Sequence, residues 1–208
     1  MTNYQIRENA RNSLGGGIFS RVWLLAVLAC FVYSAVAGIS GAFYVGILLL
    51  GPLSYGLNSV FLDLARGRGD VEIEDLFSGF KNFTNTLVLG LLQFVYVFLW
   101  TLILVIPGIV KSYSYAMSYF VMKDHPEYTP SQCITESRRL MHGKKFKLFL
   151  LDLSFIGWAI LCVFTFGLGS FWLSAYMQAS RAHFYKMLID AQKAEESEKE
   201  ASAESENA

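Results

Sequence analysis

Two residues of opposite charge lie inside long apolar stretches of this sequence, where ionisable side chains are rare. Asp152 comes six residues after the start of one stretch at Phe146, and Arg181 comes seven residues before the end of another at Leu188. At about 1.5 Å per helical residue, both would lie roughly 10 Å from the same surface. Ionisable groups inside apolar helices are costly unless they are paired or functional. We therefore expect Asp152 and Arg181 to form an ion pair between neighbouring antiparallel helices.

The two side chains could instead be accommodated separately. The arginine side chain is long enough to extend its charged group to a membrane surface. Asp152 could be protonated, or it could bond to a serine or tyrosine. The sequence leaves these two arrangements open.

The residue types needed for catalysis or metal binding do not occur in a recognisable pattern. The three histidines, His125, His142 and His183, are scattered along the chain, with no H-E-x-x-H pair, G-x-S-x-G turn or phosphate-binding loop. The three cysteines lack the paired spacing of a zinc site or a disulfide framework. The sequence therefore predicts no enzyme activity, no metal and no cofactor.

The composition indicates a membrane protein. Of the 208 residues, 54% are hydrophobic and 15% aromatic, and the mean hydropathy is +0.40, above the values usual for soluble domains. Since one helical span needs about 20 residues, the chain has room for six spans and little else. The formal net charge is zero, which offers no attraction to nucleic acid.

A repeated L-x-x-G motif divides the chain into three units. It occurs at Leu14–Gly17, Leu76–Gly79 and Leu140–Gly143, and each copy precedes an apolar region. We interpret each unit as an amphipathic cytoplasmic helix followed by a transmembrane helical hairpin. The predicted fold is all-α: a polytopic bundle of six transmembrane helices in one domain, residues 1–189, with pseudo-repeats at about 1–66, 67–124 and 125–189.

The predicted hairpins span Val22–Ala65, Phe83–Met122 and Phe146–Leu188, with turns at Gly38–Gly41, Pro107–Gly108 and Phe166–Gly169. Ahead of the first hairpin, Ile6, Ala10 and Leu14 form an apolar stripe at helical spacing, which is typical of a helix lying on a membrane surface. The stripe ahead of the second hairpin contains Ile73, Leu76, Phe77 and Phe80. Residues 190–208 hold six glutamates and two lysines and no apolar periodicity, so we expect a disordered, acidic cytoplasmic tail.

The basic residues predict the orientation. Sixteen of the 17 lysines and arginines fall on the side of the termini, which leaves Lys111 near the opposite side. Because cytoplasmic segments are rich in basic residues, both termini are expected in the cytoplasm. Five cations before the third hairpin are candidate contacts for anionic lipid, at about 1 kcal/mol each: Arg138, Arg139, Lys144, Lys145 and Lys147.

Serines and tyrosines are concentrated in the second, fourth and sixth predicted helices. Small and hydroxylated residues allow helices to pack closely and to hydrogen-bond to one another, but the same residues could line a polar cavity. The residues of this polar seam are Ser54, Tyr55, Asn58, Ser59, Ser112, Tyr113, Ser114, Tyr115, Ser118, Tyr119, Ser170, Ser174, Tyr176, Gln178 and Ser180.

Two functional classes follow from these features. The first is a non-catalytic membrane component that organises lipids or a partner, either another membrane protein or a second copy of the chain. The second is a small transporter of small molecules or lipids that uses the polar seam.

The later part of the sequence resembles a known family. The segment ESRRLMHGKKFKLFLLDLSFIGW at 136–158, together with Pro107–Gly108, Tyr176–Ala179 and Phe184–Tyr185, is similar to the bacterial integral-membrane family named domain of unknown function 975. The resemblance covers roughly residues 105–188. It implies a multi-pass protein of the bacterial cytoplasmic membrane, and it supplies no catalytic residues.

Overall fold

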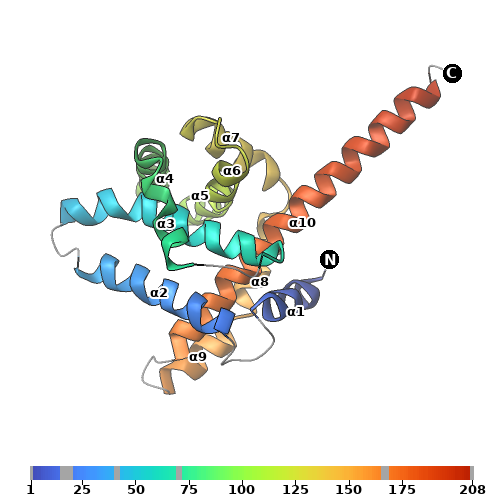
Figure 1. Cartoon of the computed structure of the whole chain (residues 1–208). Coiled ribbons are helices and arrows are strands. Elements are labelled where there is room, and N and C mark those ends of the chain that lie inside the picture. The colour runs from blue at the N-terminus through green and yellow to red at the C-terminus, as the bar shows by residue number, and fades with distance from the viewer. Residues whose placement is uncertain (1, 15–20, 40–42, 69–71, 165–168, 207–208) are drawn as a thin grey trace.

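The computed structural model describes residues 2–14, 21–39, 43–68, 72–164 and 169–206. Within these ranges the structure contains helices and turns but no strands, so the predicted all-α class is confirmed. Figure 1 shows the arrangement. The elements are α1 (Asn3–Ser13), α2 (Arg21–Ile39), α3 (Phe43–Ala65), the 3₁₀ helix η1 (Ile73–Phe80), α4 (Phe83–Ile103), α5 (Val105–Tyr115), α6 (Ser118–Asp124), α7 (Pro130–Leu140), α8 (Lys145–Leu153), α9 (Ile156–Phe164) and α10 (Gly169–Glu206).

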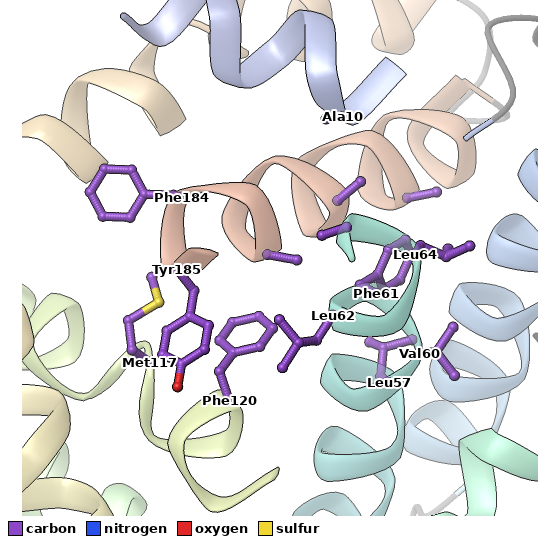
Figure 2. Close-up of a cluster of buried hydrophobic side chains, with 14 of the residues drawn as sticks. Ala10, Leu57, Val60, Phe61, Leu62, Leu64, Met117, Phe120, Phe184 and Tyr185 are labelled. Atoms are coloured by element: carbon purple, nitrogen blue, oxygen red, sulfur yellow. The ribbon is translucent and has the colours of Figure 1, made fainter. Parts of the chain in front are cut away.

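Helix α3 lies at the centre of the molecule. It contacts α1, α2, η1, α4, α6 and α10, and the half of the helix from Gly51 onward is almost entirely buried. Figure 2 shows its side chains Phe61 and Leu62 in the core with Phe120 of α6 and Tyr185 of α10. The rings of Phe120 and Tyr185 stack with their centroids 5.2 Å apart. The core therefore joins segments that lie far apart in the sequence.

Glycines let η1 approach α3 closely. A Cβ atom on Gly56 would lie 1.7 Å from the carbonyl oxygen of Leu76, and one on Gly79 would lie 2.0 Å from that of Pro52. Only glycine fits at such backbone contacts. Leu76 and Gly79 belong to the second L-x-x-G motif, and Leu76 is also buried. In this copy the motif is therefore a packing device between two helices.

The third L-x-x-G motif has a different role. Its glycine, Gly143, has φ +71, and a Cβ atom added to it would meet no neighbouring atom within 4 Å. A positive φ is costly for residues other than glycine, and glycine in this conformation commonly follows the end of a helix. Gly143 thus ends the segment after α7, whereas Gly17 of the first motif lies outside the described residues.

The structure does not support six transmembrane helices. Within the described parts of the chain, one helix is long and apolar enough to cross a membrane, at Phe83–Leu102 in α4. The later apolar regions are divided into shorter helices, α5 and α6, then α8 and α9, of seven to 11 residues. A nine-residue helix is about 14 Å long, less than half of the hydrocarbon core.

The hairpins also differ in direction and in detail from the prediction. In Figure 1 the α2 and α3 ends that face each other lie at the left, while α9 and the start of α10 lie at the bottom. The turn between α4 and α5 is at Leu104, and the predicted turn residues Pro107 and Gly108 are already helical. Gly108 instead packs against Thr101 of α4.

Helix α1 is amphipathic as predicted, but its apolar face packs on protein. Ile6, Ala10 and Leu14 are each fully buried, and α1 contacts α10, α3 and α8. Two long-range hydrogen bonds hold it there: the Tyr176 hydroxyl donates to the Arg7 carbonyl at 3.1 Å, and Ser13 Oγ bonds to His183 Nε2 at 3.1 Å. The expected membrane-surface role of this stripe is therefore replaced by contact with the core.

The acidic tail is helical instead of disordered. Helix α10 continues without a break to Glu206, and Figure 1 shows its last part extending away from the other helices. Alanine, glutamate and lysine have high helix propensity, and Gln192 donates a hydrogen bond to Glu196 one turn later at 2.9 Å. Low hydrophobicity thus left the tail without a core but did not prevent it from forming a helix.

Candidate functional site

The structure places Asp152 and Arg181 in contact. Arg181 Nη2 donates to Asp152 Oδ2 at 2.8 Å, and Arg181 Nε lies 3.4 Å from Oδ1. The Tyr113 hydroxyl donates to the same Oδ2 at 3.2 Å. Asp152 therefore has both partners considered from the sequence, an arginine and a tyrosine.

This cluster joins α8, α10 and α5. The Asp152 side chain is 13% exposed and that of Arg181 is 37% exposed, so the carboxylate is the better shielded of the two. A buried carboxylate is stable in the charged form when a cation and further hydrogen bonds satisfy it. The arrangement is suited to fixing three helices together.

A second charged network lies near the ends of α3 and α6, and the sequence reasoning missed it. Lys123 Nζ contacts Asp63 Oδ2 at 2.6 Å and donates to the Ser59 carbonyl at 2.6 Å. Arg66 Nη2 donates to Asp124 Oδ2 at 2.6 Å. The Tyr185 hydroxyl of α10 donates to that same oxygen at 2.9 Å.

The surroundings of this network shift the pKa values of its two basic groups, Lys123 and Arg66, in opposite directions. Burial lowers the pKa of Lys123, although the hydrogen bond to Asp63 works against that effect. The hydrogen bond to Asp124 is the largest cause that raises the pKa of Arg66. The only signal in the sequence is that an acid and a base occur close together near the ends of two predicted helices. These neighbours are Asp63 and Arg66 at one end, and Lys123 and Asp124 at the other. Nothing local links those ends.

The five cations proposed for lipid contact surround the turn between α7 and α8. Arg138, Arg139 and Lys144 are exposed, and Lys145 and Lys147 are partly exposed. Arg139 forms a two-pronged ion pair with Glu136, with Nη2–Oε1 at 2.6 Å and Nε–Oε2 at 2.9 Å, and this hydrogen bonding raises its pKa. The charge of Arg139 is therefore partly neutralised within the protein.

Exposed apolar side chains follow this basic cluster directly along the chain. Phe146 is 68% exposed, and Ile156 and Trp158 are 50% and 52% exposed. Cations next to exposed aromatic and aliphatic groups are typical of protein surfaces at the boundary between lipid headgroups and acyl chains.

Lys111 of α5 contacts an aromatic side chain of α4. Its Nζ is 4.5 Å from the centroid of the Trp100 ring, a cation–π contact. Helix α7 packs on α4 and α5. The position of Lys111 on the side opposite to the basic cluster stays a prediction.

Among the described residues, exposed large apolar side chains are concentrated on α4 and α5. Only 11% of the apolar stretch within Phe83–Leu102 of α4 is buried. Phe94 and Phe98 are 53% and 54% exposed and stack on each other with centroids 5.9 Å apart. At the turn, Leu102 and Ile106 are 72% and 75% exposed. Contiguous apolar exposure on this scale marks a surface that contacts lipid or another protein.

The polar seam residues bond mainly to their neighbours. Tyr33 and Ser54 lie 3.3 Å apart through their hydroxyls, and the Asn58 amide donates to the Ser54 carbonyl at 2.7 Å. The Ser137 hydroxyl of α7 donates to the backbone carbonyl of Ser114, near the end of α5, at 2.9 Å. These bonds match the packing alternative for the seam.

The three histidines lie on different elements. His125 follows α6 and stacks on Tyr128, with centroids 4.5 Å apart. His142 is exposed in the turn after α7, and His183 is buried in α10 against Ser13. The structure does not bring these histidines together.

Comparison with known proteins identifies a family. The model of a family described as protein of unknown function (DUF975) matches residues 1–110 and 101–192. The chain belongs to the DUF975 family. No curated protein and no solved structure gave a significant match. The two DUF975 matches contain every element from α1 to the body of α10, including both charged networks, and end where the acidic tail begins.

Proposed function

We propose that this DUF975 protein is a non-catalytic component of the bacterial cytoplasmic membrane that organises lipids or a partner protein. The exposed apolar face of α4 carries the proposal. The helix has 21 residues and is therefore about 31 Å long, close to the thickness of the hydrocarbon core. Its aromatic side chains Phe94 and Phe98 remain about half exposed among the described residues.

The basic cluster supports the same function at the membrane surface. Arg138, Lys144 and Lys145 lie just ahead of the exposed Phe146. Each free cation near an anionic surface contributes about 1 kcal/mol of attraction. The partners we propose are membrane lipids together with another membrane protein or a second copy of the chain. Insertion as a multi-pass protein with both termini in the cytoplasm is part of the proposal, supported by the charge count.

Membrane insertion of α4 can be tested by charging its exposed face. The double variant Phe94→Glu, Phe98→Glu places two carboxylates where aromatic rings are half exposed. We expect the wild-type chain to stay in the membrane pellet after extraction with alkaline carbonate, and the variant to be released. The matched control is Ala194→Glu with Ser197→Glu on the exposed tail of α10, which should stay in the pellet. A wild-type chain that is released completely by carbonate would contradict insertion.

Orientation can be tested by labelling single cysteines. In a background without the natural cysteines, the Thr135→Cys variant carries its thiol on the exposed face of α7. We expect this thiol to react with an impermeant reagent only after the cells are opened. Labelling of the same variant in intact cells would place α7 outside and contradict the proposed topology.

The transporter alternative rests on the polar seam alone. The hydrogen bonds of Ser54, Asn58 and Ser114 are formed within the protein, and none of the seam residues lines the cavity described below. The packing of the seam thus supports the non-transporting function, and substrate flux in reconstituted vesicles is the measurement that would reverse this choice.

A further inference from the structure

A cavity of about 570 Å³ lies where α1, the end of α3 and α10 meet. Its volume is in the range of sites that bind small molecules. The lining combines polar groups from three parts of the sequence with the apolar side chains of Leu64 and Met187. The polar lining residues on which the argument rests are Asn9, Asn12, Arg68, His183, Lys186 and Asp190.

Hydrogen-bond donors outnumber acceptors in this cavity. Arg68 and Lys186 can only donate, and the amides of Asn9 and Asn12 supply further N–H groups. Asp190 is the single acid in the lining, and Arg68 also contacts Asp63, whose charge Lys123 already balances. The cations around the cavity therefore exceed the acids by one. A complementary ligand is therefore small, rich in acceptor oxygens and negatively charged.

Both cationic side chains are exposed, so they can turn toward a ligand in the cavity. The Arg68 side chain is 71% exposed, and its Nη1 contacts Asp63 Oδ1 at 3.2 Å. An exposed ion pair of this kind contributes little stability and exchanges easily. Lys186 is likewise exposed on α10. Deeper in, His183 and Ser13 are held by their mutual bond and by the bond from Ser13 Oγ to the Ala10 carbonyl at 3.0 Å, so that part of the wall is fixed.

We propose that this cavity binds a phosphate group carried by a small ester, with Arg68 and Lys186 holding the phosphate oxygens. Asn9 and Asn12 donate to the remaining oxygens, and Leu64 and Met187 cover the organic part. The phosphate could come from a lipid headgroup or from a soluble molecule, because both present the same oxygens. The inference goes beyond the proposed membrane function and does not depend on insertion of α4.

The experiment is calorimetric titration of the purified full chain with two anionic probes, glycerophosphoglycerol and inorganic phosphate. We expect saturable binding of at least one probe. The variants Lys186→Gln and Asn12→Asp should each weaken it about tenfold or more, because a hydrogen bond to a charged group is lost or a like charge is added. Both positions are exposed, so thermal unfolding should be unchanged. Lys193→Gln, which removes the same charge from the exposed tail of α10, should leave the affinity unchanged.

The two probes separate the sources of the phosphate. Binding of glycerophosphoglycerol alone would assign the cavity to a lipid headgroup, whereas equal or tighter binding of inorganic phosphate would assign it to a soluble anion. Absence of saturable binding to both probes would overturn the proposal. Binding that Lys186→Gln and Asn12→Asp leave undiminished, or that Lys193→Gln weakens equally, would also overturn it.

Discussion

Helices α3 and α4 are both long and strongly apolar, yet they occupy opposite environments. Helix α3 has 23 residues and lies among six other elements, whereas α4 has 21 residues and exposes most of its apolar window. The difference lies in the small and polar residues. Helix α3 carries Gly51 and Gly56 at close backbone contacts, and on the side that faces α3 helix α4 has Gly90 against Gly51. The exposed side of α4 presents large aromatic side chains instead.

The comparison shows that a high apolar content predicts a helix but does not predict whether protein or lipid covers that helix. Close helix contacts require small residues, because they let backbones approach. Large apolar side chains without such neighbours remain available to lipid or to a partner. Helices of equal hydropathy can therefore be a protein core or a membrane-facing surface, and the distribution of glycine, serine and asparagine separates the two.

The sharpest test of this comparison removes one phenylalanine from each helix. Phe61 on α3 is fully buried, and Phe94 on α4 is 53% exposed. We expect Phe61→Ala to lower the free energy of unfolding by about 4 kcal/mol through the cavity it leaves, and Phe94→Ala to change it by less than about 0.5 kcal/mol. Denaturant titration of both variants in the same detergent measures the difference. Equal losses would break the distinction between the helices.

The glycine contacts of α3 can be tested by adding a single methyl group. Gly56→Ala would place Cβ against the Leu76 carbonyl oxygen, which is backbone and cannot turn aside. We expect a loss of about 3 kcal/mol, the upper range for overpacking. The matched variant is Gly157→Ala on α9, where no atom lies within 4 Å, and it should be neutral or stabilising by up to about 1 kcal/mol. Thermal unfolding followed by circular dichroism measures both.

The polar cluster of α8 and α10 extends the comparison to ion pairs, which α4 cannot form because it contains no acidic or basic residue. We expect Asp152→Asn to cost about 2 kcal/mol, since Arg181 loses its partner while remaining partly exposed. Adding Arg181→Gln should cost less than about 1 kcal/mol more if the two are coupled. A double-mutant cycle on the unfolding free energy measures the coupling. Fully additive losses would show that the contact contributes nothing of its own.

The smallest effect is expected for the end of α10. Residues 191–198 are exposed apart from the partly covered Gln192, so deletion after Asp190 removes almost no buried area in this described segment. The free energy of unfolding should change by less than about 0.5 kcal/mol, as measured by thermal unfolding of the shortened chain. A marked loss would show that an exposed helix can matter as much to this fold as a buried one.

The local sequence patterns predicted where helices form better than they predicted what each helix contacts. The stripe of Ile6, Ala10 and Leu14 identified the buried face of α1, but periodicity shows only which face is apolar, and α10 covers it where a membrane surface was expected. The same limit applies to the six predicted spans, because hydropathy does not register the breaks after Tyr115 and Leu153.

The candidate sites also differ in whether the sequence could predict them. The pairing of Asp152 with Arg181 followed from their equal depth in adjacent helices, a relation that the sequence contains. The pairing of Lys123 with Asp63 joins helix ends 60 residues apart, and no spacing rule connects them. The L-x-x-G copies show that similar letters can have different geometry, since Gly79 makes a close backbone contact while Gly143 adopts a positive φ.

The hydrogen bonds that fasten α1 to α10 have a consequence for how the protein is made. Tyr176 and His183 bond to residues 169 and 170 positions earlier in the chain. At about 5–20 residues per second of synthesis, the first helix leaves the ribosome roughly 10–30 s before its partner exists. During that interval the apolar stripe of Ile6, Ala10 and Leu14 lacks the cover that α10 provides, so the growing chain exposes apolar surface until its last helix is made.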